Sequence, residues 1–226
     1  MQYINCYKGR FLERPNRFIA YVDIDGQREK VHVKNTGRCK EILLPDVDVY
    51  LEKSDNPARS TAYDLVAARK GDRIINIDSQ APNKAVLEWL KAGRLFPDLT
   101  LVRPETTFGN SRFDFYAERE GEKIFIEVKG VTQEAEDIVM FPDAPSDRAV
   151  KHVEELIQAK HAGYRVFVLF VIQMENVRFF TPNRQIHKEF ADSLKKASEE
   201  GVEVIAYDCT VTEDSMVLHE PVEVRL

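Results

Sequence analysis

Residues 112–130, RFDFYAEREGEKIFIEVKG, combine the pattern of two β-strands with charged residues inside that pattern. Apolar residues alternate with others on both sides of Glu120-Gly121, and such a turn between two alternating runs predicts a β-hairpin. Residues equally far from the turn then face each other. Arg119 faces Glu122, and their opposite charges favour this register. Because a shift by one residue would turn every side chain to the other face, the register decides which residues lie together.

The same register brings two carboxylates together. Asp114 and Glu127 are expected to face each other across the hairpin, with Lys129 on the same side. Facing Cβ atoms in a sheet lie about 5 Å apart, so two like charges there are unfavourable unless something positive lies between them. The opposite face is predicted to be wholly apolar core, made of Phe113, Phe115, Ala117, Ile124, Ile126 and Val128.

A hard divalent cation would satisfy this acidic pair. Mg²⁺ is bound through one or two carboxylates together with water and substrate phosphate, rather than by a full cage of protein ligands. In that interpretation Lys129 contacts the attacking water or the phosphoryl oxygens. The alternative is a surface acid pair neutralised by Lys129 and Arg112 without a metal. Spacing alone does not decide between the two.

Composition sets wide limits. The chain has 226 residues, of which 43% are hydrophobic, so it can form one large domain or two small ones with their own cores. The net charge of −6 gives no bulk sign of a nucleic-acid binder. The charge is unevenly distributed, however, because the first 40 residues carry 9 lysines and arginines against 4 acidic residues. This asymmetry permits a phosphate-binding surface, and equally an ordinary solvated face.

The cysteines and the apolar runs bear on the cellular compartment. Cys6, Cys39 and Cys209 lie in unrelated contexts without a CxxC spacing, which argues against a disulfide framework or a zinc cluster. No run approaches the roughly 18 apolar residues of a membrane span, and the N-terminus has no apolar signal segment. We therefore expect a cytoplasmic protein that makes no membrane contact.

Residues 1–80 are predicted to form an OB-like β-barrel. Alternating runs at residues 17–24 and 29–35 flank Asp25-Gly26, a strong hairpin signal, and two further runs follow. A five-stranded OB barrel suits this length and binds nucleic acid in many proteins. Basic and aromatic residues alternate here as stacking and phosphate contacts require, although core aromatics and solvated arginines would give the same pattern. The candidate DNA-binding residues are Arg10, Arg14, Arg38 and Arg59.

Residues 81–226 are predicted to form an α/β domain with a mixed sheet. Pro82 lies at the start of a helix that ends at Gly93. The unbroken apolar run RVFVLFVIQ is typical of a strand buried on both faces. The remaining predicted elements are the charged hairpin, amphipathic helices at 147–163 and 183–201, and a strand at 202–209.

The predicted helix at 147–163 carries a polar stripe. Arg148, Lys151, His152 and Glu155 recur at helical spacing and therefore share one side of the helix. Such a row can hold a nucleic-acid backbone over the acidic pair, or it can be a solvated face. Arg148, Lys151 and His152 are our candidate DNA-binding residues in this domain. The sequence has no GxSxG, Walker A or GxGxxG motif, so other common chemistries lack support.

Longer segments carry a family resemblance. NTGRCKEILLP, SDNPARSTAYDL, SRFDF, IEVKGVT and FPDAPSDRAVKH, in this order, resemble the sugar fermentation stimulation protein A (SfsA) family. The spacing of Asp114 from Glu127-Val128-Lys129 is also similar to the short signature of the PD-(D/E)XK nuclease superfamily. The resemblance implies an N-terminal OB-like barrel, a C-terminal PD-(D/E)XK nuclease-like domain and DNA binding.

The same resemblance implies roles for individual residues. Asp114 and Glu127 would ligate Mg²⁺ or Mn²⁺, with the Val128 carbonyl as a third ligand. Lys129 would orient the water nucleophile, whose pKa the metal lowers. Glu105 is either an additional acidic ligand across the cleft or an exposed loop residue. The catalytic candidates are therefore Asp114, Glu127 and Lys129.

Three functions are open at this point. The first is a metal-dependent DNA endonuclease that uses the barrel to hold the strand. The second is a non-catalytic DNA-binding regulator of sugar metabolism genes, because a nuclease fold does not establish activity. The third is an OB-type carbohydrate or protein-binding module, whose binding would lack the steep salt dependence of phosphate contacts. DNA is the expected partner, RNA is an alternative, and a homodimer is left open.

Overall fold

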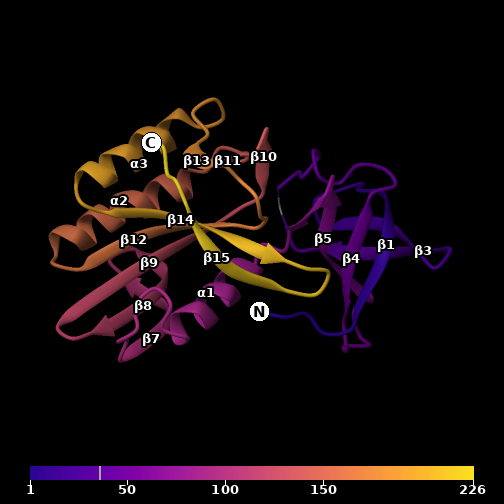
Figure 1. Cartoon of the computed structure of the whole chain (residues 1–226), viewed down its shortest axis with the longest axis horizontal. Coiled ribbons are helices and arrows are strands. Elements are labelled where there is room, and N and C mark those ends of the chain that lie inside the picture. Colours follow the sequence, from indigo (N-terminus) through magenta and orange to yellow (C-terminus); the bar gives the residue numbers. More distant parts are fainter. Residues whose placement is uncertain (36) are drawn as a thin grey trace.

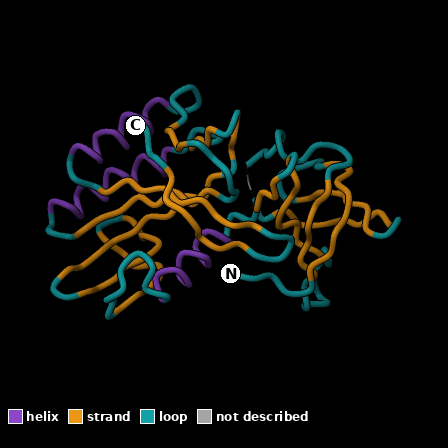
Figure 2. The backbone as a smooth tube through the Cα atoms, in the orientation of Figure 1, coloured by secondary structure: helices purple, strands orange, loops and turns teal. Residues whose placement is uncertain are grey.

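The protein has two parts, a β-barrel followed by an α/β domain (Figure 1). The structure is a computed structural model that describes residues 1–35 and 37–226; Thr36, in the segment NTGRCKEILLP, lies outside the described residues. Strands make up the barrel, whereas the helices all belong to the second part (Figure 2). The predicted fold class, an OB-like barrel followed by an α/β domain with a mixed sheet, is confirmed.

The barrel is a sheet closed on itself. Its strands run in the order β3-β2-β1-β4-β5-β6, and a parallel pairing between β3 and β5 closes the ring of five. The Asp25-Gly26 turn joins β2 to β3 with positive φ angles of 53° and 80°, as a tight hairpin requires. The strands are β1 (Cys6–Glu13), β2 (Ile19–Ile24), β3 (Gln27–Val33), β4 (Asp48–Lys53), β5 (Tyr63–Lys70) and β6 (Arg73–Asn76).

The central strand β1 has no counterpart among the runs predicted from the sequence. Charged residues interrupt its apolar alternation, and Gly9 lies in its middle. A Cβ atom at Gly9 would lie 2.5 Å from Cγ1 of Val22, so the close approach of β1 to β2 requires glycine there.

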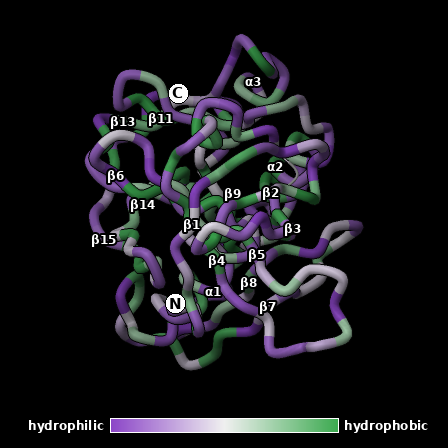
Figure 3. The backbone as a smooth tube through the Cα atoms, turned by 90° about the vertical axis from the view of Figure 1, so that its right-hand side faces the viewer, coloured by the Kyte–Doolittle hydropathy of each residue, from purple (hydrophilic) through white to green (hydrophobic). Residues whose placement is uncertain are grey.

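Figure 3 views the molecule from the barrel side, with mostly hydrophilic turns around the periphery of the tube.

The second part is built on a mixed sheet of order β15-β14-β12-β9-β8-β7, in which β9, β12 and β14 are parallel. Helix α1 covers one face, and α2 and α3 cover the other (Figure 1). A small sheet, β10-β11-β13, lies beside it. The elements are α1 (Ala81–Lys91), β7 (Leu101–Phe108), β8 (Ser111–Arg119), β9 (Glu122–Val131), β10 (Gln133–Ala135), β11 (Ile138–Phe141), α2 (Asp147–His161), β12 (Arg165–Ile172), β13 (Phe179–Pro182), α3 (Lys188–Glu199), β14 (Glu203–Val211) and β15 (Met216–Val222).

The predicted helices are present, with one shifted boundary. Gly93 follows α1 at a φ of 67°, as expected for the residue that ends a helix. At the start of α2 the Ser146 hydroxyl accepts a hydrogen bond from the Ala149 N–H at 3.2 Å, which caps the helix. The third helix starts at Lys188 rather than at residue 183. The Asn183 carbonyl accepts hydrogen bonds from the Ile186 and His187 N–H groups, and these bonds form a turn before the helix.

The predicted hairpin register is confirmed from Arg119–Glu122 to Phe115–Ile126. Beyond that pair the β8–β9 ladder stops, so Asp114 and Glu127 are not ladder partners. The predicted apolar face was wrong at one position. Phe113 packs with the core on the α2 side, whereas Phe115 packs with the core on the α1 side. The strand therefore departs from simple alternation at Asp114, between these two residues.

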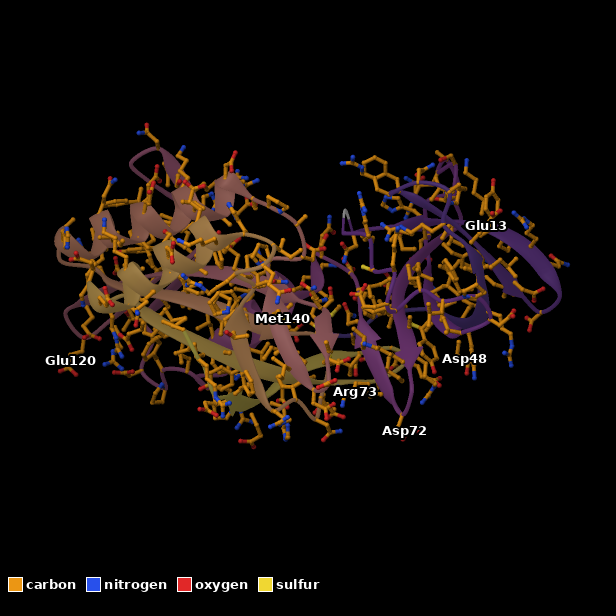
Figure 4. All side chains as sticks on the ribbon, turned by 90° about the horizontal axis from the view of Figure 1, so that it is seen from above. Glu13, Asp48, Asp72, Arg73, Glu120 and Met140 are labelled. Atoms are coloured by element: carbon orange, nitrogen blue, oxygen red, sulfur yellow. The ribbon has the colours of Figure 1, made fainter. Side chains whose placement is uncertain are left out.

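Buried hydrogen bonds join the barrel to the second part. The Gln173 side chain, which directly follows β12, donates to the backbone carbonyls of Asn76 at 3.0 Å and Asp78 at 3.1 Å. Asn76 in turn donates to the Tyr3 hydroxyl at 2.8 Å. Arg73 adds an ion pair with Asp137 at 2.6 Å, and Figure 4 shows Arg73 on the side of the barrel that faces the second part. These contacts fix how the two parts sit relative to each other.

Candidate metal centre and nucleic-acid interface

Asp114 lies at the point where the β8–β9 ladder ends. One carboxylate oxygen accepts a hydrogen bond from the Val128 backbone N–H at 2.7 Å, and the other accepts one from the Asn83 side chain of α1 at 2.7 Å. Burial, followed by the nearby negative charge of Glu127, raises the pKa of Asp114 above its usual range. The two acids are therefore close enough to influence each other although they are not ladder partners.

Glu127 is buried, with 2% of its surface exposed. Its Oε1 atom accepts a hydrogen bond from Lys129 Nζ at 2.6 Å and another from His152 Nδ1. Burial opposes the charged form, but the hydrogen bond from His152 and the charge of Lys129 outweigh it and hold the pKa of Glu127 below its usual range. The second oxygen, Oε2, is buried and has no hydrogen-bond partner.

His152 was predicted to contact DNA, and its position corrects that prediction. The ring is 7% exposed, and Nδ1 donates to Glu127. Its Nε2 accepts a hydrogen bond from Arg148 Nε at 3.4 Å, which is consistent with a proton on Nδ1. Both ring nitrogens are thus used inside the protein. His152 positions Glu127 and is not available at the surface.

The other residues of the α2 stripe are partly exposed and partly buried. Arg148 and Lys151 are exposed at the start of the helix, as a phosphate contact requires. Glu155 is 7% exposed and lies 3.8 Å from Lys151, and its Oε2 atom is buried without a partner. The stripe is therefore no uniform solvated face: two cations reach solvent and two other side chains are buried.

A hard divalent cation fits the residues that come together here. Asp114 and Glu127 supply two carboxylates, and the orphaned Oε2 of Glu127 is a charged oxygen that needs a positive partner. Across residues 1–35 and 37–226, no group of three or more histidine, cysteine, aspartate or glutamate side chains is placed to hold a metal.

Glu105 does not complete the site. It lies on β7 with 66% of its side chain exposed, and its carboxylate lies 3.4 Å from Arg112. Its φ of 51° is a left-handed conformation that few non-glycine residues adopt. The structure therefore brings Glu105 to Arg112, and the predicted additional acid is not at the site.

The four arginines predicted to bind DNA from the barrel fall into two groups. Arg59 forms a two-pronged ion pair with Asp64, with N–O distances of 3.0 and 2.5 Å. Arg14 holds a loop together, because its guanidinium donates to the carbonyls of Arg17, Asn35, Gly37 and Arg38 at 2.6–2.9 Å. Their donors are largely used within the barrel. Arg10, which donates to the Asp46 carbonyl at 3.1 Å, and Arg38 are exposed.

Asn83 is a site residue that the sequence analysis missed. It lies in the first turn of α1 and donates to Asp114, so it holds one oxygen of that carboxylate. A single asparagine near the start of a helix gives no signal of this role, because its partner lies on a strand 31 residues away. Its position next to Pro82 was visible, but its direction depends on how α1 packs on the sheet.

Comparison with protein-family models places both parts of the chain. Residues 12–77 match the model described as the SfsA N-terminal OB domain. Residues 80–215 match the model described as the sugar fermentation stimulation protein RE domain. Together these two matches account for most of the chain.

Whole-chain relatives agree with the family models. The chain is 55% identical to the sugar fermentation stimulation protein homolog of Ruminiclostridium cellulolyticum and 56% identical to that of Clostridium beijerinckii, over the full length of each protein. It is 28% identical to the SfsA of Pyrococcus furiosus, whose structure was determined in complex with Ca²⁺. That match has a TM-score of 0.89 and covers 100% of this chain and 98% of the other. Among the described residues, no helix is both long and apolar enough to cross a bilayer.

Proposed function

This chain belongs to the sugar fermentation stimulation protein (SfsA) family, and we propose that it is a DNA-binding protein with a Mg²⁺-dependent phosphodiesterase site. The site consists of Asp114, Glu127 and Lys129. The chemistry proposed is hydrolysis of a phosphodiester bond in DNA. The predicted PD-(D/E)XK character of the second domain is part of this proposal.

One observation carries the proposal. The Oε2 atom of Glu127 is buried, belongs to a carboxylate whose pKa is held below its usual range, and lacks any hydrogen-bond partner. A buried charged oxygen without a partner is costly, so proteins rarely keep one without use. The raised pKa of Asp114, caused by burial and then by the charge of Glu127, describes the same shortage of positive charge.

Each residue has a defined task in this proposal. Asp114 and Glu127 would hold Mg²⁺ or Mn²⁺, and a bound ion would supply an activated water and screen the charge on the phosphate. Lys129 holds Oε1 of Glu127 at 2.6 Å, and its remaining donors are available to a phosphate oxygen or water. His152 holds the same oxygen and so leaves Oε2 as the open ligand. Val128 presents its N–H to Asp114, and its carbonyl stays a proposed third ligand.

Two further observations support the proposal. The Pyrococcus furiosus relative was determined in complex with Ca²⁺, an ion that takes the same oxygen ligands as Mg²⁺. Exposed cations lie on both parts of the chain, and phosphate contacts from such side chains give sequence-independent binding. The exposed candidates for DNA contacts are Arg10, Arg38, Arg148 and Lys151.

Cleavage assays on three variants test the proposal. We expect the wild-type protein with Mg²⁺ or Mn²⁺ to cut DNA. Asp114→Asn, Glu127→Gln and Lys129→Met should each lower the cleavage rate by on the order of 10³-fold, because each removes charge from the reacting centre. DNA binding measured in Ca²⁺ or chelator should change far less, since the exposed cations remain.

Glu120→Gln serves as a matched control. It removes one carboxylate from the same hairpin at the far turn, where Figure 4 shows Glu120 at the opposite end of the molecule from the barrel. This variant should cleave at the wild-type rate. If the wild type binds DNA but cuts neither DNA nor RNA with any divalent ion, the catalytic proposal is wrong and the non-catalytic regulator is favoured.

A further inference from the structure

A cleft of about 1020 Å³ lies between the barrel and the second part. One wall comes from the barrel, from β1 and from residues 37–45. The other wall comes from Gln133, residues 143–145 and Ile186 of the second part. The ion pair and buried hydrogen bonds described above hold the two parts in a fixed arrangement, so the cleft exists before any ligand arrives.

The lining of this cleft is both basic and apolar. Arg17, Arg38 and Lys40 are exposed, and none of the ion pairs found among the described residues involves them. Ile186 is 40% exposed on the opposite wall. Acidic residues are present as well: Glu13 is paired with Arg28, Asp143 lies against Gly37, and Glu41 is exposed. The apolar part of the lining includes Leu12, Leu43, Pro45, Ala144, Pro145 and Ile186.

A smaller pocket adjoins the cleft. This pocket, of about 140 Å³, shares Gly37, Gln133 and Asp143 with the cleft. Its lining includes Gly130, which follows Lys129 directly in β9. Side chains are excluded here, because a Cβ atom at Gly130 would lie 2.6 Å from Oε1 of Gln173. The cleft and the pocket together extend from the exposed cations to Gly130 at the end of β9.

We propose that this cleft binds single-stranded DNA, with the backbone along Arg17, Arg38 and Lys40 and the bases against the apolar wall. A duplex keeps its bases stacked inside and offers mainly phosphates to a protein, so it leaves an apolar wall in water. A single strand offers unstacked bases to that wall and phosphates to the cations. This inference rests on the proposed function and names its substrate class.

Binding measurements on the full-length protein test this inference. A fluorescent oligothymidylate of about 16 nucleotides, the upper end of OB-fold site sizes, is compared with a duplex of the same length in chelator. We expect at least tenfold tighter binding of the single strand. The double variant Arg38→Glu and Lys40→Glu should weaken it at least tenfold and make the salt dependence of log K less steep by roughly 1.4, or about 0.7 per phosphate contact.

Two further variants separate charge from the apolar wall. Lys30→Glu reverses an exposed lysine of β3 outside the cleft and should lower single-strand affinity much less than the double variant does. Ile186→Ser, at a position already exposed, should weaken single-strand binding and leave duplex binding unchanged. Circular dichroism confirms that each variant is folded.

The outcomes distinguish the two proposals. If the duplex binds as tightly as the single strand, or if the double variant weakens neither, the cleft inference is overturned while cleavage at Asp114 and Glu127 still stands. Tighter binding of oligouridylate than of oligothymidylate overturns the commitment to DNA. Loss of cleavage on every substrate, with single-strand binding in the cleft intact, removes the catalytic proposal alone.

Discussion

Each part of the molecule contains a buried carboxylate among cations, and the two differ in how many of their oxygens have a partner. Asp64 in the barrel is 3% exposed, and both of its oxygens are used. One contacts His32 at 3.0 Å and Arg59 at 2.5 Å; the other contacts Arg59 at 3.0 Å and Lys34 at 2.9 Å. Glu127 in the second part has both of its partners on one oxygen, and the other oxygen has none.

The difference separates an acid that holds the fold from one that can take a ligand. Burial opposes the charge of Asp64, but hydrogen bonds from Arg59, Lys34 and His32 hold its pKa well below the usual range. Glu127 also has a lowered pKa, yet its charge is only partly satisfied by the protein. A low pKa alone therefore does not identify a functional site. What distinguishes Glu127 is that its unpartnered oxygen belongs to a carboxylate that lies close to a second buried acid, Asp114.

The largest expected effect is on the free energy of unfolding, and we expect it in Asp64→Asn. Glu127→Gln, which should greatly lower the cleavage rate, should affect stability less. Asp64→Asn should lower the free energy of unfolding by about 3 kcal/mol, because it leaves Arg59 and Lys34 without their counter-charge. Glu127→Gln should change it by only about 1 kcal/mol, since the amide oxygen still accepts from Lys129 and His152. Urea denaturation of both variants measures the difference. Equal losses would mean that Glu127 is as structural as Asp64.

A divalent ion should stabilise the protein by binding at Glu127, and it should not bind at Asp64. At 100 times its dissociation constant, a bound ion adds about 2.7 kcal/mol to the free energy of unfolding. For a chain of this length that raises Tm by roughly 5–10 °C. We expect this shift in the wild type with Ca²⁺ or Mn²⁺, and none in Glu127→Gln.

Glu120→Gln is the matched control for this measurement, and it should keep the full rise in Tm. A shift that persists in Glu127→Gln would place the ion elsewhere in the molecule. This readout does not depend on cleavage, so it tests the metal site even if the natural substrate is unknown.

The smallest expected effect is in the pH dependence of stability. Asp64 has a lowered folded pKa, so its stabilisation is present above its unfolded pKa of about 3.9 and is lost as the pH falls through the folded value. Asp114 has a raised folded pKa, so its contribution is present below the unfolded value and is lost as the pH rises through the folded one. The two acids should therefore respond to pH in opposite directions.

The variant Asp114→Asn tests this sign. It should be more stable than the wild type at neutral pH by on the order of 1 kcal/mol, because the amide carries no charge to be buried or to be repelled by Glu127, and the gain should vanish near pH 4. Asp64→Asn should keep most of its disadvantage at pH 4 and lose it only as the pH falls further, through the low folded pKa of Asp64. Urea denaturation at neutral pH, at pH 4 and at a lower pH measures both responses. A loss of stability in Asp114→Asn at neutral pH would show that the acid pair is not under repulsion.

Much of the fold followed from local patterns. The Asp25-Gly26 turn, the end of α1 at Gly93 and the register of the charged hairpin all depend on residues near one another in the chain. Strand β1 was not predicted, because its apolar alternation is broken and Gly9 is used for close approach to β2. The break in alternation at Asp114 was missed as well, since the pairing pattern continues up to Phe115.

The site was predicted less completely than the fold. The sequence singled out Asp114, Glu127 and Lys129, and the structure has Glu127 hydrogen-bonded to Lys129 with Asp114 close by. The roles expected for His152 and Glu105 depended on where their side chains point, and periodicity gives a helix face without its neighbours. Asn83 could not be recognised, because its contact with Asp114 requires α1 to lie across the sheet.

The sequence by itself determined the three helices, the hairpin register as far as Phe115–Ile126 and the identity of the acids, because these depend on short-range periodicity and turn geometry. Tertiary structure alone decided which carboxylate oxygen was left without a partner. It also decided which arginines are used internally and where the two parts leave a cleft. These properties arise from contacts between residues far apart in the chain, such as Glu127 with His152 and Asn76 with Gln173, and no local pattern encodes them.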